Sequence, residues 1–304
     1  LSIEEIQDNN GAGSGDGISA NGSDASQTWQ MLTDALNAAT GQNYQWVDEL
    51  PDYNAEGGEP GGNIRVGFLY NTNRVQLGDL AADATIAERR QFTDRIGDGV
   101  RDAGDRIGHD DSEIAAAINA ADWQNTRKSL LAEFTFNGNA VYVTANHLPS
   151  KGGSEQFWQI DQNLPAGSPE NAGWEKRTAI AEDLWSMMDR IQQADGDNRI
   201  ISGGDFNDFY FYRPLEAATG YVDAAGNARV GGARFDNLTV TKLSEAERYT
   251  YAFDGRSQAI DHVLVDQQLG GVATYDVVHI NTGYNNRGGT NPALSDHDPA
   301  MAQF

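Results

Sequence analysis

The sequence predicts an α/β fold in which two mostly antiparallel sheets pack against each other. Strand patterns occur in both halves of the 304-residue chain with few helical patterns between them, whereas a doubly wound parallel sheet alternates strands with helices. An Asn-Gly-Asn turn at 137–139 lies between two strand patterns and predicts a hairpin. No internal repeat or linker interrupts the sequence, so we expect one domain spanning residues 1–304.

The first elements are a strand, a long loop and a helix. LSIEEIQ predicts a strand that ends near Ile6, and the Gly, Asn, Asp and Ser-rich stretch 8–26 predicts a loop, either solvated or cation-binding. We expect Ser26 to cap a helix, because apolar residues recur at helical spacing from Trp29 to Ala39.

The rest of the chain supplies further strands and one long amphipathic helix. The charged segment 81–122 alternates Arg with acidic residues, as solvated helices do, and an interaction of these arginines with phosphates is the alternative. Residues 174–193 predict a helix whose aromatic and aliphatic residues lie on one side. Strands are expected at 44–47, 64–70, 130–136, 140–146, before GGDFNDF at 203–209, at 260–265, 274–280 and 301–304.

The composition is strongly acidic. Asp and Glu outnumber Lys and Arg by 45 to 21, which gives a net charge of −24, and only four of the 21 basic residues are lysines. A polyanionic partner would ordinarily be disfavoured. This bias is, however, typical of a protein from a very salty environment, where a Debye length of about 3 Å screens repulsion from a nucleic acid. The alternative is a soluble acidic protein from an environment of ordinary salt concentration.

Several kinds of site are excluded by the sequence. Because there is no cysteine, there can be no disulfide, thiolate metal site or cysteine nucleophile. No run of eighteen apolar residues and no signal-peptide pattern occurs in this stretch.

Four polar clusters follow predicted strands: NHLPSK at 146–151, GGDFNDF at 203–209, IDHVLV at 260–265 and LSDHDP at 294–299. Carboxylates and imidazoles at successive strand ends are costly to bury unless they converge on each other or on a cation. A mixture of Asp, Asn, Glu and His suits Mg²⁺ or Mn²⁺, with Ca²⁺ as an alternative, because hard cations prefer oxygen ligands. The chemistry that this predicts is hydrolysis of a phosphate ester.

Together these segments resemble the endonuclease/exonuclease/phosphatase superfamily, which contains DNase I, abasic-site endonucleases, inositol polyphosphate phosphatases and bacterial sphingomyelinases. The clusters occur in family order over essentially the whole sequence. The segments QDNNG, GGNIRVGFLYN, RKSLLAEFTFNG, NHLPSKGG and RYTYAFDGRSQAIDHVLV are most similar to secreted bacterial and archaeal nucleases. The resemblance implies a DNase I-like four-layer α/β/β/α sandwich and an extracellular location.

The resemblance also implies roles for individual residues. Glu5 and Asp296 match the family's metal ligands. Alternation along a strand puts Glu4 and Glu5 on opposite faces, and the register of the motif favours Glu5, whereas a slip of one residue would exchange the two. His297 resembles the general base that takes a proton from the attacking water, and Asp261 resembles the carboxylate that orients it.

The remaining matches concern the phosphate and the leaving group. Asp205 and Asn207 match residues that position the nucleophile, the phosphate or a second cation, and His147 matches a His that contacts the phosphate or protonates the leaving oxygen. Substrate phosphate contacts are expected from Arg127, Asn146, Lys151 and Tyr70, although core packing is at least as good an interpretation for Tyr70.

The sequence departs from the family pattern in two places, at the first strand and near the residue that supports His147. The family's first strand carries an Asn that helps to fix the metal, and nothing precedes Leu1 to supply it, so we expect the numbered chain to lack a first strand. The acidic residue that supports the equivalent of His147 in DNase I relatives is replaced here by the local residues Asn63, Ile64 and Arg65.

Three functions are compatible with these residues. A nuclease would cleave DNA, with RNA left open, and Arg127, Lys151 and Arg287 would touch phosphates. A lipid or small-molecule phosphoesterase is the alternative, motivated by the aromatic run 209–212 and by Phe157 and Trp158, which could equally stack bases or fill the core. A binding protein on an inactive fold would be expected to lose some of the six residues Glu5, Asp205, Asn207, Asp261, Asp296 and His297, and all six are present.

Overall fold

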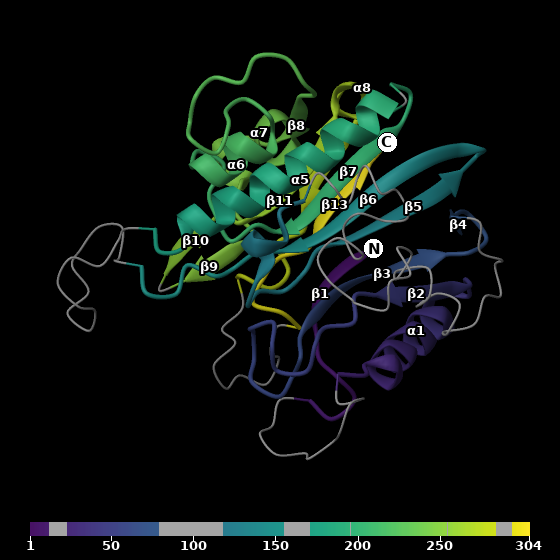
Figure 1. Cartoon of the computed structure of the whole chain (residues 1–304). Coiled ribbons are helices and arrows are strands. Elements are labelled where there is room, and N and C mark those ends of the chain that lie inside the picture. Colours follow the sequence, from purple (N-terminus) through teal and green to yellow (C-terminus); the bar gives the residue numbers. More distant parts are fainter. Residues whose placement is uncertain (12–22, 79–117, 155–170, 195, 254, 284–293) are drawn as a thin grey trace. The chain divides into compact units, whose positions relative to one another are not determined.

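The structure is a computed structural model that describes residues 1–11, 23–78, 118–154, 171–194, 196–253, 255–283 and 294–304. The chain forms two compact units (Figure 1). The first unit comprises Leu1–His147 and Ser186–Gly204, and the second comprises Leu148–Trp185 and Asp205–Phe304. Most of the charged segment 81–122 lies outside the described residues, as do Phe157, Trp158 and Arg287.

The first unit contains a three-stranded antiparallel sheet ordered β1-β3-β2. Its strands are β1 (Ser2–Ile6), β2 (Tyr44–Asp48) and β3 (Arg65–Asn71). All seven residues of β3 are buried, because both faces of this central strand are covered. Successive side chains of a strand point to opposite faces, so a strand is buried along its whole length only when both faces are covered.

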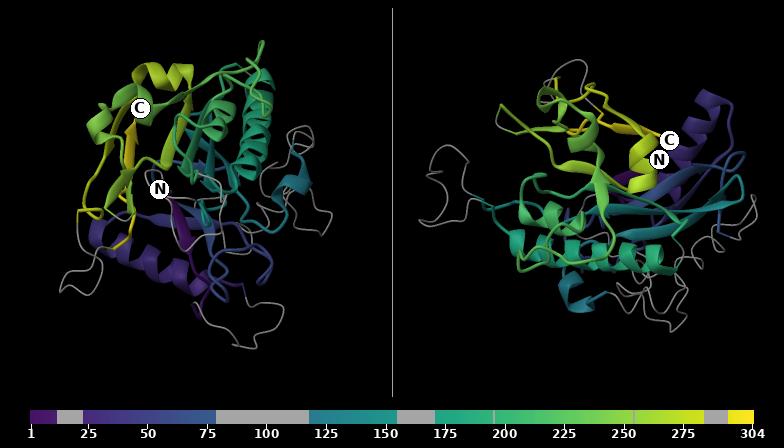
Figure 2. Two further views of the ribbon diagram at one scale, coloured as in Figure 1. Left: turned by 90° about the vertical axis from the view of Figure 1, so that its left-hand side faces the viewer. Right: turned by 90° about the horizontal axis from the view of Figure 1, so that it is seen from above.

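One face of this sheet is covered by the helix α1 (Ser26–Thr40), which lies along β2 and β3 (Figure 2). Trp29 of α1 stacks on Trp46 of β2 at 5.9 Å between ring centroids. A side chain at Gly67 would lie 2.5 Å from the Trp29 ring, so glycine is required for this close approach.

The start of α1 differs from the prediction. Ser26 is the first helical residue and not the cap, and Ala25 at the cap position makes no side-chain hydrogen bond. The Asn9 side chain instead accepts the N–H groups of Gln27 at 2.8 Å and Thr28 at 3.3 Å. A capping oxygen supplied from eighteen residues earlier leaves no local sequence signal.

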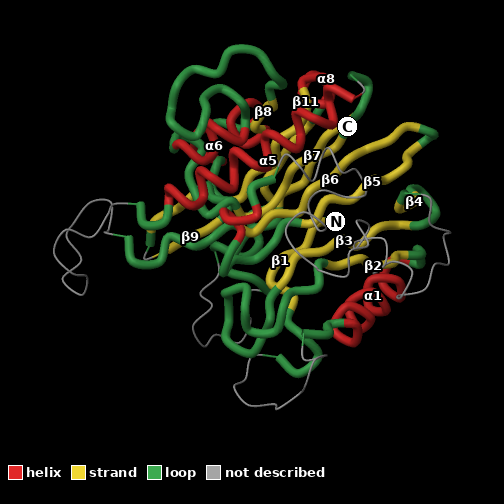
Figure 3. The backbone as a smooth tube through the Cα atoms, in the orientation of Figure 1, coloured by secondary structure: helices red, strands yellow, loops and turns green. Residues whose placement is uncertain are grey.

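The other face of the sheet packs on a second group of strands. β4 (Gln76–Leu77), β5 (Leu130–Phe136), β6 (Asn139–His147) and β7 (Arg199–Asp205) are neighbours in that order. The long hairpin of β5 and β6 is prominent in Figure 3, and its turn places both Asn137 and Gly138 at positive φ, as the type I′ turn requires. Phe134 contacts Phe68 and Tyr70 across the two sheets at 5.6 and 5.5 Å between ring centroids. The first unit therefore contains two packed sheets, with α1 on the outer face of one of them.

The second unit is built from short elements. Its antiparallel pairs are β8 (Phe235–Asn237) with β11 (Asp261–Asp266), β9 (Tyr251–Phe253) with β10 (Arg256–Gln258), and β12 (Thr274–Val277) with β13 (Ala300–Gln303). The short helices are α6 (Arg213–Ala218), α7 (Leu238–Lys242) and α8 (Gln267–Val272), with the 3-10 turn Glu245–Glu247. The helix α5 (Trp174–Ala194) is divided between the units, because its residues up to Trp185 belong to the second unit and those from Ser186 belong to the first. The 3-10 turn Ala120–Trp123 belongs to the first unit.

The predicted α/β class with mostly antiparallel strand pairs is confirmed, and every described strand expected from the sequence is present. The helix predicted at 174–193 is also present, although Trp174 and Trp185 are only half-buried. None of the helices among the described residues is both long and apolar enough to cross a membrane.

Candidate active site

The residues predicted from the sequence fall into two groups, one in each unit. The second unit holds Lys151, Asp205, Asn207, Asp261, Asp296 and His297, and the first holds Glu5, Tyr70, Arg127, Asn146 and His147. Each group is described within its own unit.

His297 and Asp261 form a hydrogen-bonded pair. Asp261 is the first residue of β11, and its Oδ2 lies 2.8 Å from Nδ1 of His297. The imidazole also packs against the Tyr251 ring at 4.6 Å between centroids, and the two residues form an isolated β-bridge. A carboxylate on Nδ1 holds the ring in the tautomer that leaves Nε2 to accept a proton.

The pKa of His297 depends on its acidic neighbours. Burial lowers the pKa, but the hydrogen bond and charge of Asp261, with the charges of Asp205 and Asp296, raise it to about 9. At pH 7 roughly one imidazole in a hundred would then be neutral. A nearby cation would lower this pKa, so the capacity of His297 to act as a base rises with pH and with positive charge at the site.

Asp205 and Asn207 lie at the end of β7 in a tight turn. Asp205 Oδ1 accepts a hydrogen bond from the Asn207 backbone N–H, and Asp205 Oδ2 accepts one from the Asn207 side-chain amide, both at 2.7 Å. Asn207 has a φ of 51°, a left-handed conformation that Asn adopts more readily than most residues. Burial, followed by the charge of Asp261, raises the pKa of Asp205 to about 7. Asp205 can therefore exchange a proton near neutral pH.

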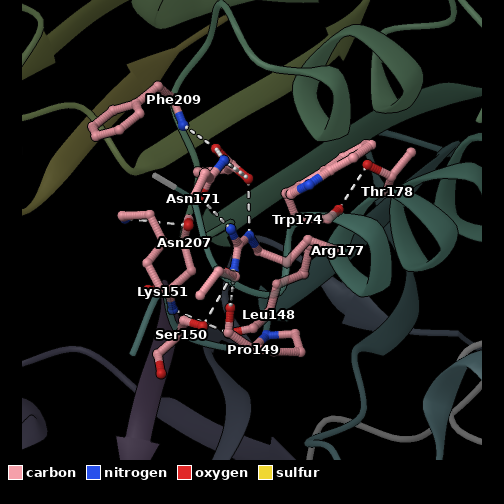
Figure 4. A network of polar contacts seen from close by, with 12 residues as sticks. Leu148, Pro149, Ser150, Lys151, Asn171, Trp174, Arg177, Thr178, Asn207 and Phe209 are labelled. Carbon is pink, nitrogen blue, oxygen red and sulfur yellow. Dashed lines mark hydrogen bonds and ion pairs between the residues drawn. The ribbon is translucent and has the colours of Figure 1, made fainter. Parts of the chain in front are cut away.

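Lys151 brings a positive charge to this turn. Its Nζ donates to the Asn207 carbonyl at 3.2 Å and lies 5.0 Å from the centroid of the Phe209 ring (Figure 4). Burial lowers the pKa of Lys151, while the charges of Asp205 and Asp208 oppose that effect. The ammonium group is therefore positioned beside the residues expected to bind phosphate.

Arg177, which the sequence did not single out, organises the same region. It is fully buried, and its Nε lies 2.9 Å from Asp208 Oδ2 (Figure 4). Its other nitrogens donate to the carbonyls of Pro149, Ser150 and Ala172 and to the Asn171 side chain. Arg177 therefore ties the segment before Lys151 to the residue after Asn207. The burial of Arg177 could have been predicted from its spacing. It lies three and four positions before Ile180 and Ala181, and therefore on the buried side of an amphipathic helix.

In the first unit, His147 ends β6 and is 6% exposed. Its Nε2 lies 3.7 Å from Glu5 Oε1, and its carbonyl accepts the Nε–H of Arg127 at 3.3 Å. The structure therefore brings together the predicted leaving-group acid, one predicted metal ligand and the predicted phosphate-binding arginine.

Glu5 occupies an irregular strand. The pairing of β1 with β3 shifts between Ile3 and Ile6, and Glu5 has a φ of 58°. Simple alternation therefore does not apply here, and a β-bulge directs the side chain. The Glu5 side chain is 63% exposed beside His147, whereas Glu4 Oε1 lies 2.7 Å from the position that a Gly204 side chain would occupy.

Asn146 and Tyr70 are buried and have polar partners within the first unit. Asn146 is fully buried, and its side chain bonds Ser129 at 2.8 Å and the Gly203 carbonyl at 2.9 Å. Tyr70 is 7% exposed within the core cluster of the two sheets, and its hydroxyl donates to Gln45. The phosphate contacts expected of these two residues stay predictions.

The comparisons with known proteins concern the fold. No family model and no curated protein matches the sequence at a significant level, but many solved structures are similar to the chain. Several of these are endonuclease/exonuclease/phosphatase family proteins.

One is the endonuclease/exonuclease/phosphatase from Bacteroides vulgatus, with a TM-score of 0.47 and 12% identity over 88% of this chain and 78% of that one. Another is D. rerio TDP2 complexed with single-stranded DNA product, with a TM-score of 0.45 and 14% identity over 99% and 97%. A third is a mannosyl-6-phosphatase from Bacteroides thetaiotaomicron, with a TM-score of 0.44 and 13% identity over 100% of both chains. These values support no conclusion about activity.

The predicted metal ligands fit a divalent cation in type. Asp296 and Glu5 are both exposed carboxylates, and hard cations prefer such oxygens. Among the residues that the structure describes, no group of three or more His, Asp or Glu side chains is arranged to hold a metal.

Proposed function

We propose that the chain is a metal-dependent phosphodiesterase that cleaves DNA. The observation that carries this proposal is the 2.8 Å hydrogen bond between His297 and Asp261, with Asp205 and Lys151 in the same unit. A His held by a carboxylate is suited to removing a proton from water, and general base catalysis of this kind contributes typically 10²- to 10⁴-fold. The sequence resemblance supports the choice of a phosphate ester as substrate.

The other residues have roles that follow from their contacts. The side-chain amide of Asn207 donates to Asp205 Oδ2 and to the Leu148 carbonyl, so we assign to Asn207 the role of holding the turn beside the phosphate without adding negative charge. Lys151, which donates to the Asn207 carbonyl, supplies a positive charge at this turn. We assign protonation of the leaving oxygen to His147, beside Glu5, and orientation of His147 to Arg127 through the His147 carbonyl. An alkoxide is otherwise expelled poorly.

From the sequence resemblance, Glu5 in the first unit and Asp296 in the second are each proposed as a carboxylate ligand for Mg²⁺ or Mn²⁺, with Ca²⁺ as the alternative. A bound divalent cation would polarise the phosphate and neutralise charge that develops on it. Binding would also lower the pKa of His297, because the carboxylate of Asp296 contributes to raising it.

A lipid or small-molecule phosphoesterase is the second candidate. It is favoured by one observation, the Phe211 side chain, which is 53% exposed within the aromatic run that follows Asn207. An exposed aromatic residue beside a catalytic turn could enter a lipid surface.

One experiment separates these candidates from each other and from an inactive scaffold. Plasmid DNA, a phosphomonoester and sphingomyelin vesicles are incubated with the native protein and Mg²⁺ or Mn²⁺ over a series of salt concentrations, with His297→Ala as control. We expect nicking of DNA by the native protein alone, persisting in molar salt as the acidic composition predicts. Hydrolysis of another substrate with intact DNA would reject the nuclease, and no hydrolysis would favour the scaffold. A secreted, extracellular protein remains our proposal for its location.

A further inference from the structure

Four aromatic residues follow Asn207 and Asp208, and their rings form one cluster in the second unit. Phe209 and Phe211 are stacked with 5.4 Å between centroids and 5° between planes. Tyr210 lies edge-on to Phe211 at 5.1 Å, and Tyr212 contacts both Phe211 and Phe209 at 5.3 and 5.9 Å. The stack therefore begins two residues after Asn207, one of the proposed substrate-positioning groups.

This cluster is not a closed core. Phe206, on the same segment, is fully buried, whereas Phe211 is 53% exposed and its neighbours in the run are half-buried. Leaving half of a phenyl ring in water forgoes part of the stabilisation that full burial would contribute. The stacking nevertheless fixes the ring in a defined orientation with a surface open to a ligand.

Two cations accompany the rings. Lys151 Nζ lies over the Phe209 ring and donates to the Asn207 carbonyl. The Arg248 guanidinium lies 5.3 Å from the Tyr210 centroid, and it is anchored by donation to the carbonyls of Leu243 and Val240. The carboxylates of Asp205, Asp208 and Asp261 also act on Lys151. A cation held against an aromatic ring is nevertheless complementary to an anionic ligand that also carries a π-face.

We propose that the Phe209–Phe211 stack binds an unpaired nucleobase next to the scissile phosphate, so that the preferred substrate is single-stranded nucleic acid or a frayed or gapped strand. This inference rests on the proposed function. A base inside a duplex has both faces covered by its neighbours, whereas an unpaired base can place a face on Phe211. Lys151 lies against Phe209 and touches Asn207, and so it links the base site to the phosphate site.

The inference is tested by binding and cleavage of matched strands. Variants Phe211→Ala and Phe211→Trp are made in the native chain for cleavage and in His297→Ala for binding without turnover. Tyr221→Ala is the matched control, since Tyr221 is 57% exposed and also lies near a cation, Arg234. The probes are a fluorescent single strand, the same strand in a duplex, and the same strand with abasic residues. Sphingomyelin vesicles are the fourth probe.

We expect Phe211→Ala to weaken binding of the base-containing single strand by roughly 5- to 100-fold. Binding of the duplex and of the abasic strand should change little, and Phe211→Trp and Tyr221→Ala should bind like the parent. Equal weakening on the abasic strand, unchanged binding of the base-containing strand, or Phe211-dependent binding of vesicles without an effect on DNA would overturn the inference. Failure of the proposed function would be distinct: the native chain would cleave no DNA, whatever Phe211→Ala does to binding.

Discussion

Replacement of Arg177 by methionine tests whether one buried cation holds the phosphate-binding turn together. The guanidinium is fully buried and bonds one carboxylate, one amide and three backbone carbonyls. Methionine fills much of the same volume but donates no hydrogen bond. The carboxylate of Asp208 would then stay buried without its cation, although Asn171 and the Phe209 N–H still donate to it.

The expected loss follows from these contacts. Removing one partner of a buried ion pair costs about 3–5 kcal/mol, and net contributions of about 0.5–1.5 kcal/mol for each lost hydrogen bond give a similar total. A domain is typically stable by only about 5–15 kcal/mol, so the variant should unfold at a much lower urea concentration. The Arg213–Glu216 pair, 3.6 Å apart with side chains 32% and 46% exposed, is the control, and Glu216→Gln should cost less than about 0.5 kcal/mol.

A double-mutant cycle with Asp208→Asn completes the test by urea denaturation at fixed pH and salt. Because each single variant leaves a buried group without its partner, the double variant should be at least about 1 kcal/mol more stable than additivity predicts. Additive effects, or a loss below about 1 kcal/mol in Arg177→Met, would refute the view that Arg177 organises the turn.

Two further predictions concern stability. Gly204→Ala should cost at least about 3 kcal/mol, because its Cβ would lie 2.1 Å from the Asn146 carbonyl oxygen at a φ of 133°. Gly153→Ala, with open space around it, should lose only about 1 kcal/mol in the same chemical denaturation. Burial lowers the pKa of His262, so the unfolded chain takes up the proton first as the pH falls. The stabilising contribution of neutral His262 is therefore present above its unfolded pKa of about 6.5 and is lost below it, with a slope of up to about 1.4 kcal/mol per pH unit. Unfolding free energies of the native chain and His262→Gln between about pH 8 and about pH 5 should diverge accordingly, and parallel curves would contradict this.

Much of the fold could be predicted because its signals are local. The Asn-Gly turn between β5 and β6 and the apolar spacing in α1 each depend on neighbouring residues, and both predictions are confirmed. The cap of α1 could not be predicted, because Asn9 reaches it from a distant part of the chain. Regular alternation was assumed for Glu4 and Glu5, whereas the pairing of β1 with β3 shifts between Ile3 and Ile6 and so departs from that alternation.

The candidate site, too, could be predicted where the signal lies in a local motif and not where it depends on contacts between distant segments. The pairing of His297 with Asp261 matches the expectation taken from their motifs. The partners of Asn146 and Tyr70, which are Ser129, Gly203 and Gln45, could not be predicted because they lie on other segments of the chain. Arg177 was overlooked because its partners come from three separate segments that only the tertiary structure brings together.

The most direct test of the central claim is the rate of plasmid DNA cleavage by His297→Ala, Asp261→Asn and the double variant, with Mg²⁺ or Mn²⁺ at a pH near 9. If His297 and Asp261 act as one unit on the attacking water, His297→Ala should lower the rate by roughly 10²- to 10⁴-fold. The double variant should then be no slower than His297→Ala alone, because residues that act together are not additive. A native rate in His297→Ala, or a double variant whose loss equals the product of the single losses, would contradict the account.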